Sequence, residues 1–439
     1  MTTSLEGRKA AIGRAGTFRV YGRVVQVVGL LVEVTGMTPC LGEVCHACPE
    51  GVPPIALEVV GFREDRILAM PLGGTDGIGP GCRVRATGRK ACAEVGDRLV
   101  GRVLDGMGNP IDGLDPFPPM AARSIYGAEM NPLFKERISE PLDVGIRAVN
   151  ALITIGKGQR VGIMAGSGVG KSVLLGTMAR YTRADLSVIA LVGERGREVR
   201  EFIEKDLGAE GLKRSVVVVA TSDKPPLVRL RAAQLATAYA EYFRGRGMDV
   251  LLMMDSATRV AMAQREVGLA AGEPPTTKGY PPSSFALLPK LLERAGTAQG
   301  KGSITGLYTV LVEGDDLNDP VVDTMRSILD GHIVLSRDLA ARGHYPAIDV
   351  LRSVSRVMTD IVDDAQLSAV RRFKEVLADY MRNEDLINIG AYRPGSNAKV
   401  DYAIRMKEKA DGFLKQGLKE GVQLPQSLQA LYTLLNEEA

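Results

Sequence analysis

An apolar strand that runs directly into a glycine-rich loop and then into helical sequence constrains this chain more than any other feature. The strand spans residues 160–165, and the residues that follow are, in order, Gly166, Ser167, Gly168, Val169, Gly170, Lys171, Ser172 and Val173. Glycines let successive backbone N–H groups turn toward one point, and the helix amino end adds the positive end of its dipole. Lys171 suits the charge of a phosphate chain, and the Ser172 hydroxyl suits a Mg²⁺ ion bound to it. The order therefore predicts a nucleoside triphosphate site.

One position departs from the usual pattern of this motif, because Ala165 stands where glycine is expected. A methyl group is tolerated there if the backbone φ is negative. The alternative interpretation is a flexible glycine-rich turn with a solvated lysine. The strand before the loop and the helix after it argue against that alternative.

Further apolar runs alternate with helical sequence on both sides of this motif. They are residues 187–192, 215–220, 250–254 and 307–312. Uninterrupted apolar strands separated by helices are typical of a parallel sheet covered on both faces. The ligand site of such a sheet lies at the carboxyl ends of its strands, so the functional residues are expected there.

The strand at residues 250–254 ends in Asp255. A carboxylate at that edge would hold a Mg²⁺ ion opposite Ser172. An aspartate after a strand also caps helices in many proteins, so this signal is weak alone. Its distance from the glycine-rich loop, on the same predicted sheet, makes the metal role the better interpretation.

The strand at residues 187–192 delivers Glu194 to the same edge. Hydrolysis needs a group that orients the attacking water, and Glu194 is the candidate base, with Arg195 beside it as a further candidate catalytic residue. Glu198 and Glu201 compete with Glu194, although both fall on predicted helical sequence. A plain ion pair between Glu194 and a neighbouring arginine is the structural alternative.

Three regions are expected along the chain: a small β-barrel at residues 1–90, a RecA-like nucleotide-binding domain at 91–359 and an all-α region at 360–439. Short apolar runs broken by glycine and proline predict the barrel strands, at residues 20–27, 31–34, 55–60, 67–71 and 83–87. Residues 110–119, which contain four prolines, read as an extended connector.

The third region contains a long amphipathic stretch at residues 364–382. Its apolar side chains fall on one predicted helical face, namely Leu367, Val370, Phe373, Leu377, Tyr380 and Met381. A stripe that faces the core of a helical domain explains this pattern better than membrane binding does.

The charge balance excludes several classes of partner. The 55 basic and 52 acidic residues leave a formal charge of +3, so no overall field favours nucleic acid or a membrane. Residues 1–16 lack the apolar core of a signal peptide, and no run of eighteen apolar residues occurs. The chain is therefore expected in the cytoplasm.

The cysteines are too few and too unevenly spaced for a disulfide scaffold. Cys40, Cys45, His46 and Cys48 form a cluster that has to be weighed as a zinc site. A closed structural site needs four ligands at suitable spacing, and no second pair of ligands follows. A loop of reduced thiols is therefore expected, with metal binding by Cys40, Cys45 and Cys48 left open.

Several longer stretches point to a known family. The first is GERGRE, in which Glu194 is the second residue. The others are DSATRVAMAQREV beginning at Asp255, GEPPTTKGYPPSSFALLPKLLERAG at Gly272, TVLVEGDD at Thr309 and DGHIVLSRDLAARGHYPAIDVLRSVSRV at Asp330. With the glycine-rich loop, they resemble the flagellar and type III secretion export ATPases, relatives of the rotary ATPase α and β subunits. The resemblance covers nearly the whole chain.

The resemblance implies a homohexameric ring that hydrolyses ATP, bound with Mg²⁺, at the interfaces between subunits. It assigns the phosphate lysine to Lys171, the catalytic carboxylate to Glu194 and the metal carboxylate to Asp255. It also assigns to Arg356 the role of an arginine finger that reaches into a neighbour's site, and to Tyr345 the role of stacking on adenine. Without the resemblance, Arg356 reads as a surface residue and Tyr345 as a packed tyrosine.

The resemblance also implies partners. These are a stator-like regulatory protein at the amino-terminal part, a coiled-coil stalk protein in the ring centre, export chaperone–substrate complexes at the carboxyl-terminal region, and an export gate at the inner membrane, to which the ATPase is peripheral. Asp315, Asp316 and Asp319 are expected to form a turn and gate that faces the ring interior, with no metal role. No nucleic acid partner is expected.

Three other functions share parts of this pattern. The catalytic subunit of a proton-coupled ATP synthase has equivalents of Lys171, Glu194 and Asp255, but the LLERAG segment and residues 383–392 resemble the export branch. A noncatalytic ring subunit is disfavoured because Lys171 and Glu194 are both present.

A ring-shaped RNA translocase is the third alternative. It needs aromatic side chains on which bases stack, and the first 90 residues contain only Phe18, Tyr21 and Phe62. Within the export family, the segment NEDLINIGAYRPGSN favours flagellar export over injectisome export by resemblance alone.

Overall fold

A computed structural model describes residues 20–127, 131–300, 302–312, 314, 316 and 319–436. These residues form two compact units. The first contains the described residues up to Cys92 together with Pro225–Val228 and Glu266–Pro274, and the second contains the rest. The expectations for residues 1–16 and for Asp315 lie outside the described residues.

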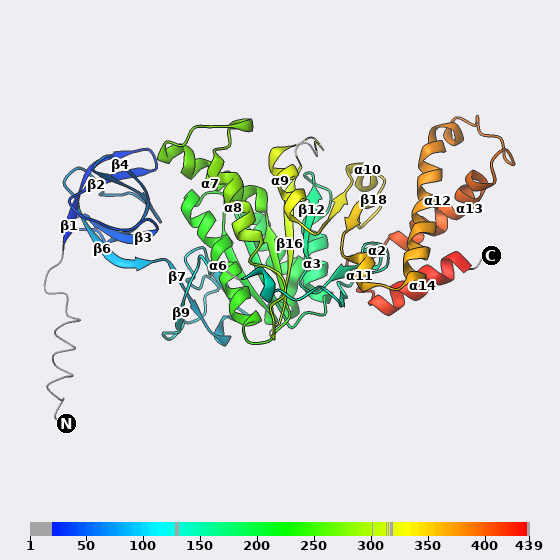
Figure 1. Cartoon of the computed structure of the whole chain (residues 1–439), viewed down its shortest axis with the longest axis horizontal. Helices are drawn as coiled ribbons and strands as arrows, with labels where there is room; N and C mark the ends of the chain where they lie inside the picture. Colours follow the sequence, from blue (N-terminus) through cyan, green and yellow to red (C-terminus); the bar gives the residue numbers. More distant parts are fainter. Residues whose placement is uncertain are drawn as a thin grey trace, which may run out of the picture. The chain divides into compact units, whose positions relative to one another are not determined.

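The first unit is a closed antiparallel barrel whose strands neighbour one another in the order β1-β2-β5-β4-β3-β6 (Figure 1). The strands are β1 Tyr21–Val28, β2 Leu31–Thr35, β3 Glu43–Cys48, β4 Ile55–Arg63, β5 Arg66–Pro71 and β6 Arg83–Lys90. Valines from β1, β2 and β6 fill the interior together with Leu57 and Ala69. The predicted amino-terminal barrel is confirmed.

The cysteine cluster was wrongly expected to be a loop, since Glu43–Cys48 is strand β3. Side chains along it alternate between buried and half-buried, which places Cys45 in the barrel core. Burial, and then the nearby carboxylate of Glu43, raise the pKa of the Cys45 thiol to about 11, so it stays protonated. Among the described residues, no group of three or more His, Cys, Asp or Glu side chains is placed to hold a metal ion. The spacing of the cysteines suggested metal ligands, although the same residues follow the two-residue period of a strand.

The second unit is built on an eight-stranded sheet in the order β18-β17-β12-β16-β15-β13-β14-β8. All neighbours are parallel except β18, which pairs antiparallel with β17 at the edge. The strands are β8 Val103–Asp105, β12 Arg160–Ala165, β13 Leu186–Val192, β14 Ser215–Ala220, β15 Val250–Asp255, β16 Ile304–Leu311, β17 Gly331–Leu335 and β18 Ile348–Ser355. Two small ribbons pair β7 Cys92–Val95 with β9 Ala121–Ser124 and β10 Pro141–Leu142 with β11 Ile155–Gly156. The predicted parallel-dominated sheet is confirmed.

Helices follow most of these strands. They are α2 Arg147–Leu152, α3 Lys171–Tyr181, α4 Gly196–Glu201, the π-helical turn η3 Phe202–Leu207, α5 Gly208–Lys213, α6 Pro226–Arg244, α7 Ala257–Ala271, α8 Pro282–Leu292, α9 Pro320–Ile328, α10 Arg337–Ala341 and α11 Met358–Ile361. Short 3₁₀ turns occur at Asp97–Leu99, Pro132–Phe134 and Thr277–Gly279. None of the described helices is long and apolar enough to cross a bilayer.

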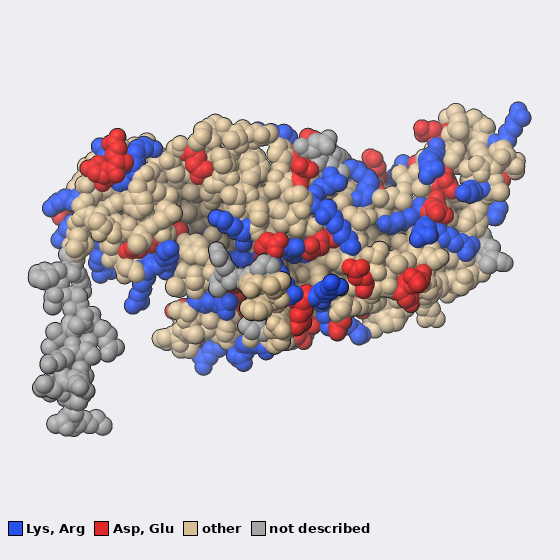
Figure 2. Space-filling view, viewed as in Figure 1, with Lys and Arg blue, Asp and Glu red and all other residues tan. Residues whose placement is uncertain are grey.

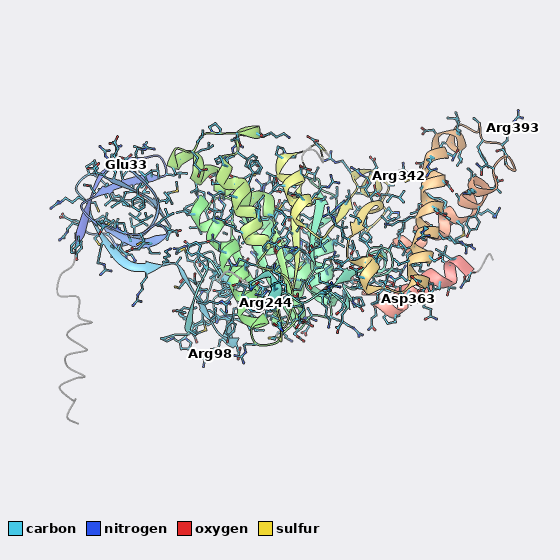
Figure 3. The ribbon with its side chains drawn as sticks, viewed as in Figure 1. Glu33, Arg98, Arg244, Arg342, Asp363 and Arg393 are labelled. Carbon is cyan, nitrogen blue, oxygen red and sulfur yellow. The ribbon has the colours of Figure 1, made fainter. Side chains whose placement is uncertain are left out.

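The chain ends in the predicted helical region, which consists of α12 Asp364–Asn388, α13 Ala398–Leu414 and α14 Leu424–Asn436 (Figure 1). Its core is continuous with that of the sheet, and the rings of Phe373 and Phe413 lie 5.4 Å apart between α12 and α13. Asp363 caps α12, and Arg342 pairs with Glu384 of α12 at 2.9 Å. Figure 3 labels Asp363 and Arg342. The helical region and the nucleotide-binding sheet therefore pack as one body.

The predicted apolar stripe on α12 is correct only over its first turns. Val370, Phe373 and Leu377 are buried, but Met381 is 56% exposed. The carboxyl-terminal turns of α12 extend past the core that covers the earlier turns, so sequence period alone overestimated the buried face.

Candidate active site

The glycine-rich loop joins β12 to α3, as its sequence order predicted. Gly168 and Gly170 have φ values of 79° and 86°, which is the left-handed region that favours glycine. Ala165 is the last residue of β12 and pairs with Leu311 and Leu335 of the neighbouring strands, so its methyl group causes no strain. The loop keeps its shape despite this departure from the usual motif.

Lys171 begins α3 and lies between two carboxylates. Its Nζ is 2.6 Å from Asp255 Oδ1 and 3.3 Å from Glu194 Oε1. Burial lowers the pKa of Lys171, but the two carboxylates more than offset that effect, so the pKa is raised above its usual value. The structure thus brings the three residues predicted for phosphate binding, metal binding and water activation into direct contact.

Asp255 reaches this cluster because β15 ends there, beside β13 and β16. It is 3% exposed, and the Thr309 hydroxyl of β16 donates a 2.7 Å hydrogen bond to its Oδ1. Thr309 was missed as a functional residue, although a polar side chain in a buried strand beside Asp255 could have signalled it. This hydrogen bond fixes the orientation of the carboxylate.

Glu194 has an environment suited to a general base. Burial raises its pKa to about 7, against the opposing effect of Lys171, and Asp255 and a hydrogen bond with Glu198 add to the increase. The same hydrogen bond lowers the pKa of Glu198. The sequence predicted Glu198 only as a competitor of Glu194, whereas the structure makes it the hydrogen-bond partner of Glu194.

The residues predicted to hold Mg²⁺ supply suitable ligands. Ser172, Glu194, Glu198 and Asp255 line one small hollow, with Leu191, Val199 and Phe202 as its apolar walls. Magnesium prefers oxygen ligands and in such sites is bound by one or two protein groups together with substrate phosphates. Ser172 and Asp255 fit an ion that arrives with the nucleotide.

Arg195 is not brought into this cluster. Its side chain is 82% exposed, and its guanidinium lies 3.6 Å from Glu198. The strand β13 delivers Glu194 to the pocket, and the chain then turns outward into α4, so the next side chain points to solvent.

A second cavity, of about 270 Å³, adjoins the glycine-rich loop. Tyr345, predicted to stack on adenine, lines it together with Gly168, Gly170 and Val173. A Cβ at Gly170 would come within 3.3 Å of the Tyr345 ring, so glycine also allows this close approach. The remaining lining residues are Ile146, Leu174, Thr177, Pro346, Gln416, Gly417 and Leu418. The sequence offered no signal for the last three.

Arg356 lies at the opposite edge of the sheet. It follows β18, whose final residue Ser355 pairs with Gly331 at the start of β17. Because β17 runs parallel to β12, this is the amino edge, whereas Lys171 follows the carboxyl end of β12. Arg356 is exposed, and its guanidinium donates to the Arg326 carbonyl at 3.1 Å. It is far along the strands from the glycine-rich loop of its own chain.

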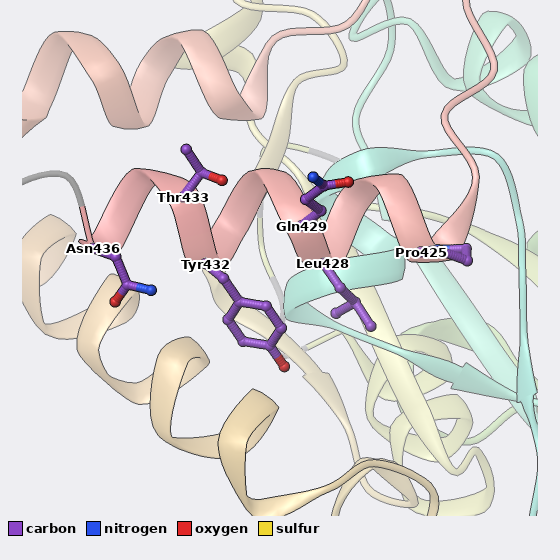
Figure 4. Close-up of a pocket in the computed structure, with 6 residues that line it drawn as sticks. All are labelled: Pro425, Leu428, Gln429, Tyr432, Thr433 and Asn436. Atoms are coloured by element: carbon purple, nitrogen blue, oxygen red, sulfur yellow. The ribbon is translucent and has the colours of Figure 1, made fainter.

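A further hollow, of about 570 Å³, lies on α14 and contains none of these groups. It is lined by Pro425, Leu428, Gln429, Tyr432, Thr433 and Asn436. In Figure 4, Leu428 and Tyr432 point to one side of α14, and Gln429 and Thr433 to the other. Its lining lacks a carboxylate or a cationic side chain, so the chemistry is assigned to the cluster around Lys171.

Comparisons with known proteins agree with this architecture. Residues 145–355 match the nucleotide-binding domain of the ATP synthase alpha/beta family, residues 24–88 match the β-barrel domain of that family, and residues 362–433 match the C-terminal domain of the type III secretion ATPase EscN. The flagellum-specific ATP synthase of Bacillus subtilis is 54% identical over 96% of this chain and 97% of its own length.

Two solved structures extend the comparison. The assembled ATPase EscN from the type III secretion system of enteropathogenic E. coli aligns with a TM-score of 0.89 and 43% identity, over 94% of this chain and all of its own. EscN in complex with its central stalk EscO aligns with a TM-score of 0.87 and 42% identity, over 94% of this chain and all of its own.

Proposed function

Because the chain belongs to the family of flagellar and type III secretion ATPases, within the ATP synthase alpha/beta family, we propose that it hydrolyses ATP as a homohexameric ring at shared subunit interfaces. Hydrolysis then drives the release of cargo from chaperones, its unfolding, and the export of flagellar proteins through a type III secretion apparatus. The observation that carries this proposal is the contact of Lys171 with both Glu194 and Asp255 at the end of the glycine-rich loop.

Each residue of the cluster has a distinct role in this proposal. Backbone N–H groups of residues 166–172 and the Lys171 ammonium bind the phosphates, and Tyr345 stacks on the base. Glu194 orients the attacking water and accepts its proton, because a carboxyl with a pKa of about 7 is half ionised near neutral pH. Ser172 and Asp255 hold Mg²⁺, which when bound neutralises charge on the phosphates.

Arg356 completes the site from a neighbouring copy. A guanidinium stabilises the charge that develops on the transferred phosphoryl group. Its position at the amino edge of the sheet, opposite to Lys171, supports a role in a neighbour's site instead of its own. Arg195, which points to solvent, is proposed to act only through its contact with Glu198.

The proposed partners follow the family. A coiled-coil stalk in the ring centre is supported by the similarity to EscN, which was solved with its central stalk EscO. We also propose a stator-like regulatory protein at the amino-terminal part of the chain, chaperone–substrate complexes at residues 360–439 and an export gate at the inner membrane, with the ATPase in the cytoplasm. Over the second unit, basic and acidic side chains are interspersed on the face shown in Figure 2, which supports the expectation of no nucleic acid partner.

Flagellar export is favoured over injectisome export. The identity to the flagellum-specific relative from Bacillus subtilis is 54%, against 50% to the type 3 secretion system ATPase of Xanthomonas euvesicatoria, so the preference rests mainly on the resemblance of residues 383–397. Deletion of the gene in its host tests this choice. We expect loss of secreted flagellin and of motility, restored by the wild-type gene but not by a Lys171→Ala gene; loss of effector secretion with normal flagella would favour the injectisome.

The ATPase activity of the purified full-length chain, measured against protein concentration, tests the proposed reaction. We expect specific activity to rise steeply as rings assemble, because the site is shared between copies. Lys171→Ala should be inactive at every concentration. Specific activity that is independent of concentration would contradict the shared site, and no ATP hydrolysis by the wild type would contradict the function.

A further inference from the structure

The segment of residues 415–423, which joins α13 to α14, lies along the P-loop helix α3 and is here called the strap. The Arg180 guanidinium donates to the Leu418 carbonyl at 2.9 Å, and the Tyr181 hydroxyl donates to the Lys419 carbonyl at 2.7 Å. Gly421 packs so closely on the Tyr181 ring that a Cβ would come within 2.4 Å of it. The strap is therefore held in one place relative to the glycine-rich loop.

Arg147, at the start of α2, fixes the point where the strap begins. Its guanidinium donates to the carbonyls of Phe413 and Lys415, at 3.1 and 3.3 Å, and pairs with Glu420 at 3.0 Å. The last carbonyls of a helix have no partner within the helix, so a cation at that place satisfies them and is attracted by the helix dipole. One side chain thus ties the end of α13 to the nucleotide-binding domain.

Gln416 is at the centre of this arrangement and is 8% exposed. Its Oε1 accepts from the backbone N–H of Arg147 at 2.7 Å, and its Nε2 donates to the carbonyls of Gly145 and Glu420 at 2.8 and 2.7 Å. Only one orientation of the amide satisfies one N–H and two carbonyls, and that orientation uses both of its N–H donors. If another side chain of similar size replaced Gln416, it could not make all three of these hydrogen bonds.

The backbone of Gln416 connects the strap to the residue that stacks on the base. Its N–H donates to the Tyr345 carbonyl at 3.0 Å. Tyr345, Gln416, Gly417 and Leu418 all line the 270 Å³ cavity beside the glycine-rich loop. Gln416 therefore holds two walls of the base pocket, namely Tyr345 and the strap.

We infer that Gln416 is a positioning residue for nucleotide binding, because it holds Tyr345 and the strap in place as walls of the base pocket. This inference rests on the proposed function, in which ATP occupies that pocket. The phosphate cradle is built separately, from the loop backbone and Lys171, so the loss of Gln416 weakens binding of the base and leaves binding of phosphates intact. Since the strap is continuous with α13 and α14, base binding and docking of the carboxyl-terminal helices are linked.

The test compares two buried glutamines that both join the helical region to the nucleotide-binding domain. Gln366 of α12 is 4% exposed, and its Nε2 donates to the Ala151 carbonyl and to the Thr154 hydroxyl at 3.0 and 2.8 Å. It does not line the base pocket, so Gln366→Ala controls for a general loss of stability. Steady-state kinetics with ATP, competition by inorganic tripolyphosphate and thermal melting are measured for full-length proteins at concentrations that give maximal specific activity.

For Gln416→Ala we expect a KM for ATP about tenfold higher, with kcat and the inhibition constant of tripolyphosphate within about twofold of the wild type. Gln366→Ala should lower the melting temperature and change neither constant. Gln416→Glu, which keeps the size of the side chain and the hydrogen bond from Arg147 but loses both donors, should behave like Gln416→Ala and decides the matter if the alanine variant does not fold.

Two results overturn the inference while wild-type hydrolysis of ATP upholds the proposed function. One is a KM for ATP within twofold of the wild type in the folded Gln416 variant. The other is an equal increase in KM and in the inhibition constant of tripolyphosphate, which would mean a general distortion of the site.

Discussion

The two cationic residues proposed to act in the reaction, Lys171 and Arg356, lie in opposite environments. Lys171 is buried at the carboxyl edge of the sheet and contacts two carboxylates, whereas Arg356 is exposed at the amino edge. Among the residues that the structure describes, no carboxylate forms an ion pair with Arg356, and its recorded partner is the Arg326 carbonyl. One chain therefore gathers Lys171, Glu194 and Asp255 in one place and leaves the Arg356 guanidinium exposed, which is the arrangement that the proposed shared site requires.

This difference separates the effects of substitution on stability from those on activity. Removing one member of a buried charge cluster leaves the others without compensation and destabilises the fold. Removing an exposed side chain with one hydrogen bond to a carbonyl has little effect on folding. Substitutions in the Lys171 cluster and at Arg356 can therefore be distinguished by measuring stability and activity together.

The largest effect is expected for Arg356→Ala. An arginine finger contributes roughly 10³ to 10⁵ in rate, so kcat should fall by at least about 10³, with the melting temperature unchanged. Steady-state kinetics and calorimetry on the same preparation measure both. Arg352→Ala, at an exposed arginine of β18, the strand that Arg356 follows, should retain activity; equal losses in the two variants would mean that the position of this strand and not the Arg356 guanidinium matters.

Glu194→Gln should reduce kcat by roughly 10² to 10⁴, the usual contribution of general base catalysis, while nucleotide binding persists. Glu201→Gln is the matched control, because the Glu201 side chain is 41% exposed and pairs with Arg197 on the same helix. Single-turnover rates and equilibrium binding of a nonhydrolysable analogue separate chemistry from binding. Full turnover in Glu194→Gln would transfer the base role to Glu198.

The functional residues at the carboxyl edge of the sheet could be predicted because the motifs that identify them are local in the sequence. A strand followed by Gly166 to Ser172, and another that ends in Asp255, place functional groups by topology alone. The amino-terminal barrel was predicted except for β3, where the cysteines resembled metal ligands. Burial along Glu43–Cys48 nevertheless alternates with the two-residue period of a strand.

Contacts between distant parts of the sequence could not be predicted. The hydrogen bond between Glu194 and Glu198 depends on how α4 turns out of β13, and the strap reaches Tyr345 from about 70 residues away in the chain. The outward orientation of Arg195 is of the same kind. Such features depend on tertiary packing and have no period or motif.

The pH dependence of kcat/KM tests the ionisation of Glu194, since this ratio depends on the pKa values of groups in the free enzyme. Glu194 is proposed to act as a carboxylate, and its pKa is raised to about 7 chiefly by burial. Activity should therefore fall about tenfold per pH unit below that value and level off above it. Because the hydrogen bond with Glu198 raises this pKa, Glu198→Ala should move the midpoint to lower pH. An identical midpoint in both proteins would assign the ionisation to the nucleotide.

The smallest effect is expected where α3, which carries Lys171, packs on the π-helical turn. A Cβ at Gly176 would lie 2.6 Å from the Asp206 Cβ and 2.7 Å from the Asp206 carbonyl, so Gly176→Ala should destabilise the fold by about 1 to 3 kcal/mol through overpacking. Gly412→Ala, in α13 with open space around it, should stabilise by up to about 1 kcal/mol. Denaturant unfolding measures the free energy of unfolding of both variants. A Gly176→Ala protein as stable as the wild type would show that α3 can shift away from the turn at no cost.

The central claim, that each site is built from two copies, is tested most directly by mixing two inactive proteins. Arg356→Ala keeps Lys171 and Glu194, and Glu194→Gln keeps Arg356, so in mixed rings about a quarter of the interfaces regain every group. We expect ATP hydrolysis to appear on mixing and to approach about a quarter of the wild-type rate if the interfaces act independently. A mixture that stays as inactive as its components, with mixed rings demonstrated by cross-linking, would contradict the shared site.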